Sequence, residues 1–293
     1  MYPRSFDYTA PTTLEQASAD VAAHPGAKIL AGGMSLIPMM KLRVLSPPTI
    51  VDIGKIAGLG SITEEAGRVE MGALVRHYQL AGNQLLVHRA TALSEAAAWV
   101  GDVQVRNRGT LCGSLAHADT SADEPAALLA LGGTMVAHST RGMRTIPAAD
   151  FFVDAFTTAL AEDEILTGAS IPLGVTGEGS AYCKVGRRGG HDGFAVAGVA
   201  AWVRLEHGEI VDARVALTGV STRPLLADGI RAALVGSDGG PEAVRTAAAR
   251  AEEGVVFIAD LYGSEDYKAH LARYLAVQAL EGALSRARRA ALS

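Results

Sequence analysis

A change of residue pattern near Pro172-Leu173-Gly174 constrains the fold of this chain most strongly. Before these chain-breaking residues, short apolar segments alternate with helical ones, whereas after them long strand-like segments come first and helices follow. The predicted strands are SAYCKVGRR, GFAVAGVAAWVRLEHG and EIVDARVALTGV, with a turn at His207-Gly208, and the predicted helices cover about 223–235, 241–254 and 264–291. We therefore predict an α+β chain with an N-terminal domain over residues 1–175 and a C-terminal domain of sheet and helices over 176–293.

The N-terminal part contains short strands and helices with recognisable ends. Thr13-Leu14-Glu15-Gln16 fits a capping box, so we predict a helix that ends at His24-Pro25-Gly26. Another helix follows Asp123 or Ser121, either of which could cap it, with Pro125 in its first turn and Gly132-Gly133 at its end. The other predicted elements are strands at 28–33, 49–53 and 164–171, hairpins around 64–67 and over 134–147, and a helical stretch over 74–100.

The composition limits the classes of function. Apolar residues make up 49% of the chain and charged residues 19%, and a net charge of -5 argues against nucleic acid as the main partner. The longest uncharged runs are shorter than the ~20 apolar residues that a membrane-spanning helix needs. No secretory leader is visible in MYPRSFDYTAP, so we expect a cytoplasmic protein. The two cysteines, Cys112 and Cys183, form no CxxC motif and are too few to hold a 2Fe–2S cluster.

Two loops of small residues are the strongest candidates for a binding site. They are AlaGlyGlyMetSerLeu (31–36) and ThrLeuCysGlySer (110–114), and small residues of this kind let backbone N–H groups approach an anion closely. The chain has no GxxxxGK[ST] motif, and GLGSIT (58–63) lacks the third glycine of the dinucleotide fingerprint. A pair of such loops could hold the two phosphates of a dinucleotide, although either loop alone is also compatible with an ordinary tight turn.

Other polar residues allow more than one interpretation. His117, Asp119 and Asp123 could be metal ligands, but helix capping and solvation explain them better, and Asp123 could also bind sugar hydroxyls. GlyArgArgGlyGlyHisAsp (186–192) fits either an anion-binding segment or a solvated turn. Lys28 and Lys184 lie in apolar strands, where lone lysines usually reach solvent. No GxSxG motif or Cys–His pairing supports a hydrolase.

Four segments, in order along the chain, resemble the FAD-binding medium subunit of the molybdenum hydroxylases. This family includes flavoprotein subunits of carbon monoxide, xanthine, nicotine and aromatic-substrate dehydrogenases. The resemblance implies an FAD-binding fold of the vanillyl-alcohol-oxidase (PCMH) type in two lobes, followed by an antiparallel sheet with a helical bundle. The segments are AGGMSLIPMMKLR (31–43), QVRNRGTLCGSLAHADTSADEPAALLAL (104–131), DEILTGASIP (163–172) and KVGRRGGHDGFAVAGVAA (184–201).

The resemblance also implies which residues contact FAD. The first loop would hold the pyrophosphate through its backbone, Asp123 would bind ribose or ribityl hydroxyls, Leu166 would lie near the adenine or flavin ring, and Lys184 would lie near the flavin. Met34 replaces a residue that is usually polar in the family, and Cys112 replaces a common glycine. The implied cofactor-binding residues are Lys28, Ile29, Leu30, Ala31, Gly32, Gly33, Met34, Ser35, Leu36, Thr110, Gly113, Ser114, Ala118, Asp123, Leu166 and Lys184.

The function implied by the resemblance is electron transfer inside a larger complex. A large subunit with a molybdenum cofactor would oxidise the substrate, a small subunit would pass electrons through 2Fe–2S clusters, and FAD in this chain would deliver them to an external acceptor. The implied assembly is a dimer of heterotrimers. We identify no catalytic acid–base residue and no metal ligand in this chain. Two alternatives are a self-sufficient flavin oxidoreductase of the same fold and an assembly protein that has lost its cofactor.

Overall fold

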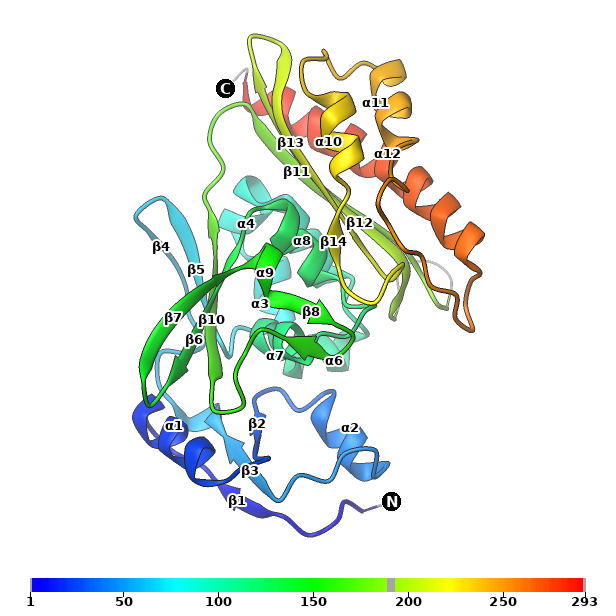
Figure 1. Cartoon of the computed structure of the whole chain (residues 1–293). Coiled ribbons are helices and arrows are strands. Elements are labelled where there is room, and N and C mark those ends of the chain that lie inside the picture. Colours follow the sequence, from blue (N-terminus) through cyan, green and yellow to red (C-terminus); the bar gives the residue numbers. More distant parts are fainter. Residues whose placement is uncertain (1, 189–192, 292–293) are drawn as a thin grey trace.

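The first lobe of the molecule is a small parallel sheet with helices beside it (Figure 1). The computed structural model describes residues 2–188 and 193–291. The strands lie in the order β1 (Asp7–Thr9), β3 (Thr49–Asp52), β2 (Lys28–Leu30), and the helices are α1 (Leu14–Ala23), α2 (Leu36–Lys41) and the 3-10 turn η1 (Ile53–Lys55). The predicted cap of α1 is confirmed in part. The Thr13 hydroxyl accepts from the Gln16 N–H, but the Gln16 side chain accepts from the Thr12 N–H rather than from Thr13.

The second lobe is built on a five-stranded antiparallel sheet. Its strands lie in the order β4 (Ile62–Glu65), β5 (Arg68–Gly72), β10 (Ile165–Pro172), β6 (Thr134–Ser139), β7 (Gly142–Pro147). The remaining elements of this lobe are α3 (His77–Gly82), α4 (Gln84–Arg89), α5 (Thr91–Ala98), α6 (Val103–Arg108), α7 (Leu111–His117), α8 (Glu124–Ala130), α9 (Ala148–Phe151), β8 (Phe152–Asp154) and β9 (Thr157–Thr158). Ser18 of α1 hydrogen-bonds His138 of β6 at 2.8 Å, which joins the two lobes.

The C-terminal part is a sheet covered by helices on both faces. Strands β11 (Glu178–Gly186), β12 (Ala195–Glu206), β13 (Glu209–Thr218) and β14 (Leu225–Leu226) form an antiparallel sheet. The helices that follow are α10 (Asp228–Leu234), α11 (Pro241–Ala248) and α12 (Glu265–Ala290). Helix α12 packs on β11 and β12, while α5 and α8 of the second lobe pack on the same sheet. Strand β12 is therefore buried over its first nine residues, on both of its faces.

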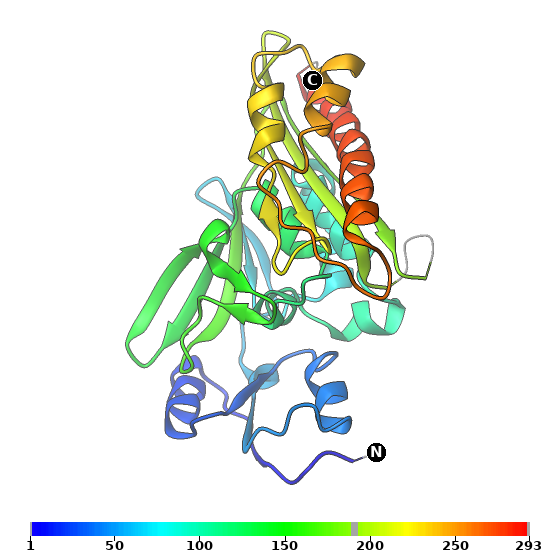
Figure 2. The ribbon, with the colours of Figure 1, turned by 45° about the vertical axis from the view of Figure 1, so that its right-hand side comes forward.

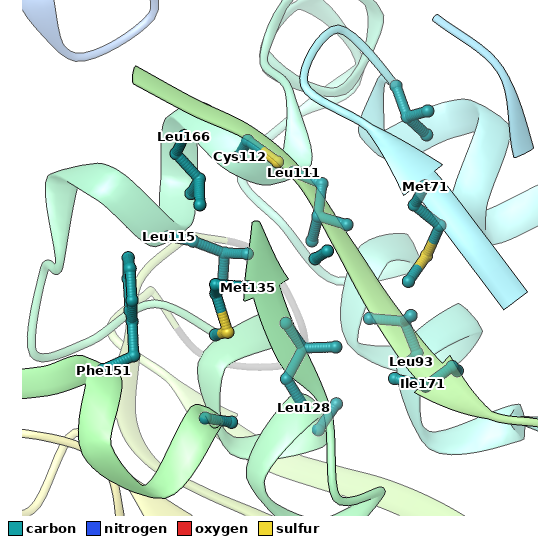
Figure 3. Close-up of a cluster of buried hydrophobic side chains, with 14 of the residues drawn as sticks. Met71, Leu93, Leu111, Cys112, Leu115, Leu128, Met135, Phe151, Leu166 and Ile171 are labelled. Atoms are coloured by element: carbon teal, nitrogen blue, oxygen red, sulfur yellow. The ribbon is translucent and has the colours of Figure 1, made fainter. Parts of the chain in front are cut away.

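The hydrophobic core of the second lobe lies between its sheet and its helices (Figure 3). Met71 and Ile171 reach it from the sheet, and Leu93, Leu111 and Leu128 reach it from α5, α7 and α8 (Figure 3). The core continues into the C-terminal sheet through side chains that include Tyr182 and Trp202. The predicted domain boundary between residues 175 and 176 falls in the connection from β10 to β11. Because the two parts share this core, the boundary remains a prediction.

Most predicted elements are present, and the differences have local causes. ThrLeuCysGlySer (110–114), predicted as a loop, is the first turn of α7, because the Thr110 hydroxyl caps the helix by accepting from the Gly113 N–H at 3.2 Å. Asp123 stands at the start of α8, but its side chain makes no capping hydrogen bond, so that interpretation was wrong. The helical stretch 74–100 divides into α3, α4 and α5, and the helix predicted from 223 starts at Asp228 after the short strand β14.

None of the helices in residues 2–188 and 193–291 combines the length and the apolar character that crossing a bilayer requires. The longest, α12, carries charged residues along its length, such as Arg273 and Glu281. Its apolar face is covered by the C-terminal sheet instead.

Gly179 of β11 sets how closely α12 packs against the sheet. A Cβ at this position would lie 2.1 Å from the Ala283 carbonyl oxygen and 2.4 Å from the Ala287 nitrogen. We predict that Gly179→Ala lowers the free energy of unfolding by about 1–3 kcal/mol because the helix must move away. Gly60→Ala is the matched control, since a Cβ there meets no atom within 4 Å. Urea denaturation of both variants tests this, and equal stability of the two would contradict it.

Candidate functional site

A cavity of about 760 Å³ lies between the first lobe and the rest of the molecule. In Figure 2 the first lobe, with β2 and α2, lies below the second lobe and the C-terminal part. Most lining residues lie within 27–36 around β2, 109–123 around α7 and 156–166 before and within β10, and others include His77, Gly193 and Phe194. Its volume is in the range of pockets that bury small molecules and cofactors.

The two small-residue segments predicted from the sequence meet at this cavity. A Cβ on Gly32 would lie 2.3 Å from the Arg108 carbonyl oxygen and 2.7 Å from Gly109 Cα. Only glycine permits this approach, because no neighbouring backbone atom can move aside cheaply. Gly32 therefore holds the first loop directly against the residues that lead into α7.

The first loop presents hydrogen-bond donors to the cavity. Within the described part of the chain, the backbone N–H groups of Gly33, Met34 and Ser35 donate to no protein acceptor, and all three residues line the cavity. Backbone N–H groups are rarely left without an acceptor unless water or a ligand provides one. The Thr110 hydroxyl, which accepts the cap bond of α7, keeps its own hydrogen free to donate into the same space.

Asp123 forms the polar centre of the opposite wall. Its carboxylate accepts from the Tyr182 hydroxyl at 2.5 Å and from the Lys184 ammonium at 2.9 Å. The Lys184 ammonium also donates to the carbonyl oxygens of Trp99 and Gly193, both at 2.7 Å, so its three hydrogens are all used. Residues from three other segments therefore position one carboxylate at the cavity.

Burial governs the protonation of this group. It raises the pKa of Asp123 to about 6, although Lys184 and the Tyr182 hydroxyl act in the opposite direction. Burial together with the adjacent Asp123 charge raises the pKa of Tyr182 well above its ordinary value. At neutral pH Asp123 is thus a carboxylate that accepts from a neutral phenol, and it can accept a further hydrogen bond from the cavity side.

A second buried pair lies beside the first. His77, at the start of α3, places Nδ1 2.5 Å from the Glu124 carboxylate, the residue directly after Asp123. Although burial alone would lower the pKa of His77, Glu124 raises it above its ordinary value overall. His77 lines the cavity. Sequence reasoning missed this residue, because a single histidine in MGALVRHYQLAG carries no motif.

Most of the sequence-predicted binding residues lie on the cavity wall. Three do not: Leu30 and Ala118 stand outside it, and Lys184 is buried behind Asp123. The expectation that Lys184 reaches solvent was therefore wrong, whereas Lys28 is exposed. Those on the wall are Lys28, Ile29, Ala31, Gly32, Gly33, Met34, Ser35, Leu36, Thr110, Gly113, Ser114, Asp123 and Leu166.

The other polar candidates have structural partners. The His117 ring packs against Phe156 with centroids 5.1 Å apart, and Asp119 accepts from the Ser121 N–H at 2.9 Å. In the basic segment, the Arg187 guanidinium lies over the rings of Phe194 and Tyr262, at 5.1 and 4.4 Å from their centroids. Residues 189–192 of that segment lie outside the described residues.

The arrangement suits an extended ligand with an anionic middle. Unpaired N–H groups lie on one wall, a carboxylate that can accept from hydroxyls lies on the other, and apolar side chains such as Leu166 and Ile29 also line the cavity. Cys112 also faces this space, and burial raises its pKa well above that of an ordinary thiol, so it contributes packing rather than a thiolate.

Comparison with known proteins identifies the chain along nearly its whole length. The family described as the FAD binding domain in molybdopterin dehydrogenase matches residues 4–174, and the CO dehydrogenase flavoprotein C-terminal domain matches residues 180–283. The chain is 37% identical over 287 residues to the carbon monoxide dehydrogenase medium chain of Hydrogenophaga pseudoflava, covering 98% of this chain and 99% of that one. It is 35% identical to the 6-hydroxypseudooxynicotine dehydrogenase complex subunit alpha of Paenarthrobacter nicotinovorans, with 98% and 97% covered.

The three-dimensional comparison agrees with the sequence comparison. The structure superimposes on carbon monoxide dehydrogenase from Hydrogenophaga pseudoflava with a TM-score of 0.93 and 38% identity, covering 98% of this chain and 99% of the other. The predicted α+β fold, an FAD-binding domain followed by a C-terminal domain, is confirmed. The chain therefore belongs to the FAD-binding medium subunits of the molybdenum hydroxylases.

Proposed function

We propose that this chain carries electrons from the 2Fe–2S clusters of a small subunit, through FAD in the cavity described above, to an external acceptor. A large subunit with a molybdenum cofactor would oxidise the substrate, and two such heterotrimers would associate. The observation that carries this proposal is the facing of unpaired N–H groups at Gly33 to Ser35 and the Asp123 carboxylate across one cavity in a chain of this family.

The residues of the chain fit the cofactor without supplying acid–base chemistry. The backbone of the first loop would hold the pyrophosphate, with Thr110, Gly113 and Ser114 beside it. Asp123 would accept hydrogen bonds from sugar or ribityl hydroxyls on its cavity side. Lys184 and Tyr182 would act as positioning residues, because both contact Asp123 and Lys184 does not reach the cavity wall.

The bound flavin would supply the ability to accept electrons singly and release them in pairs. The chain would hold the flavin in position and shield it from water. Leu166 and Ile29 offer apolar surface for the rings, and the two cysteines, both free, are too few for an iron–sulfur cluster. The substrate would then be chosen by another subunit, in line with the different substrates named for relatives of similar length and identity.

The proposed assembly predicts which cofactors accompany the chain. When the native complex is captured through a tag on this chain under mild conditions, we expect molybdenum, iron and FAD in the eluate, together with a small and a large subunit. Metal analysis, flavin absorbance after denaturation and mass spectrometry of the subunits measure these. FAD without metals, with turnover of an organic substrate by the chain alone, would favour a self-sufficient oxidoreductase, and a flavin-free complex would contradict the proposal.

The role of Asp123 is tested by removing its charge. We predict that Asp123→Asn weakens FAD binding about 10- to 100-fold, because a charge-assisted hydrogen bond contributes about 1.5–3 kcal/mol. The same change leaves the buried Lys184 without its counter-charge, which costs stability of about 3–5 kcal/mol. FAD affinity is measured by fluorescence titration and stability by urea unfolding.

A second variant separates these two effects. Asp123→Asn combined with Lys184→Met removes both charges, so stability should recover while FAD binding stays weak. Asp266→Asn, an exposed carboxylate on α12 outside the cavity, is the control and should bind FAD normally. Normal FAD affinity in the folded double variant would show that Asp123 has only a structural role.

A further inference from the structure

His77 and Glu124 form a buried ion pair on the wall of the cavity. His77 is 3% exposed and Glu124 is 0% exposed, and Nδ1 of the imidazole lies 2.5 Å from Oε1 of the carboxylate. Among the described residues, the second oxygen of Glu124, Oε2, has no hydrogen-bond partner. A carboxylate buried in this way is costly unless a cation compensates its charge. The pair is therefore best satisfied when the imidazole is protonated.

The other ring nitrogen of His77 lies where the two small-residue segments meet. A Cβ on Gly109 would lie 2.6 Å from Nε2 of His77, and a Cβ on Gly32 would lie 2.7 Å from Gly109 Cα. Gly109 therefore touches the imidazole of His77 and is in turn touched by Gly32 at the junction of the two segments. His77 lines the cavity, and Nε2 has no protein partner within the described part of the chain. A protonated ring would present an unpaired N–H group to a ligand there.

We propose that His77, kept protonated by Glu124, donates a charge-assisted hydrogen bond to the pyrophosphate of the bound dinucleotide. This rests on the proposed function, because it requires FAD in the cavity. The first loop offers neutral backbone donors, and Lys28 is an exposed cation at the cavity edge. His77 adds a positive charge that is shielded from water, where a hydrogen bond to an anion is strong.

The charges around His77 determine how binding depends on pH. Burial lowers the pKa of His77, but the charges of Glu124 and Asp123 raise it and together outweigh burial. The charge of Arg106 in α6 lowers this pKa. The Cys112 thiol of α7 is neutral, because burial and Glu124 raise its pKa. The net pKa of His77 lies above its ordinary value. Since the protonated form binds, the contribution of His77 to FAD affinity should be full below this raised pKa and should fall as the pH rises through it, whereas the contribution of the Asp123 carboxylate falls as the pH drops through about 6.

The first experiment removes the imidazole. In the full chain, together with the subunits that accompany it, His77→Gln should weaken binding of FAD and of ADP by about 10- to 100-fold at pH 7, because both ligands contain the pyrophosphate. Riboflavin, which lacks it, should bind both proteins equally. His88→Gln, an exposed histidine of α4 outside the cavity, is the matched control and should leave all three affinities unchanged.

The second experiment removes the charge that holds the proton. Glu124→Gln keeps the size of the side chain, but burial, which lowers the pKa of His77, then acts without the opposing carboxylate. FAD affinity should be about tenfold weaker than in the wild type at pH 7, and the difference should narrow at pH 5, where more of the histidine in the variant is protonated. A merely structural role would give the same change at both pH values. Thermal unfolding of the flavin-free proteins shows whether each variant is folded.

The outcomes separate this proposal from the proposed function. If the wild type binds no FAD, both are overturned. If the wild type binds FAD but His77→Gln binds FAD and ADP as tightly as the wild type does, only the role of His77 is overturned. If His77→Gln loses affinity for FAD and riboflavin but not for ADP, the proposed contact with the pyrophosphate is overturned. Where neither variant folds, the pH profile of the wild type decides, since FAD affinity that is constant from pH 6 to well above neutrality would contradict a protonated His77.

Discussion

The buried ion pair between Asp123 and Lys184 is the interaction on which the candidate site depends. Removing two charges from water is expensive, and this pair is tolerable because the Asp123 carboxylate also accepts from the Tyr182 hydroxyl and the Lys184 ammonium also donates to two carbonyl oxygens. Asp123 belongs to the second lobe, whereas Tyr182 and Lys184 belong to the C-terminal sheet. The cavity wall therefore has its final geometry only when both parts of the chain have folded against each other.

The opposite wall depends on a contact of another kind. Gly32 touches the backbone at Arg108 and Gly109, so at this point the first lobe meets the second through main-chain atoms without a layer of side chains between them. Such a contact cannot be adjusted by changing rotamers, and it fixes the distance between the first loop and α7. The geometry of one wall thus depends on an ion pair and that of the other on a close backbone contact, and the shape of the cavity depends on both.

The sequence predicted what local rules determine and missed what depends on distant partners. The α1 cap at Thr13, the turn at His207-Gly208 and the meander follow from short-range patterns, and they are present. The same local reasoning placed Lys184 in solvent, but its three acceptors come from Trp99, Asp123 and Gly193, far from one another in sequence. His77 was overlooked for the same reason, because its significance arises only beside Glu124 and Gly109.

Adjacent carboxylates at the start of α8 have partners with different chemistry. Asp123 pairs with a lysine from the C-terminal sheet, and Glu124 pairs with His77 from the second lobe. Two neighbouring buried anions would repel each other, so each needs its own cation, and the backbone turn at the helix start directs the side chains to separate partners. Histidine is the side chain whose charge changes nearest to neutral pH. Both pairs therefore respond to pH, the Asp123 pair as the pH falls through about 6 and the Glu124 pair as the pH rises through the raised pKa of His77.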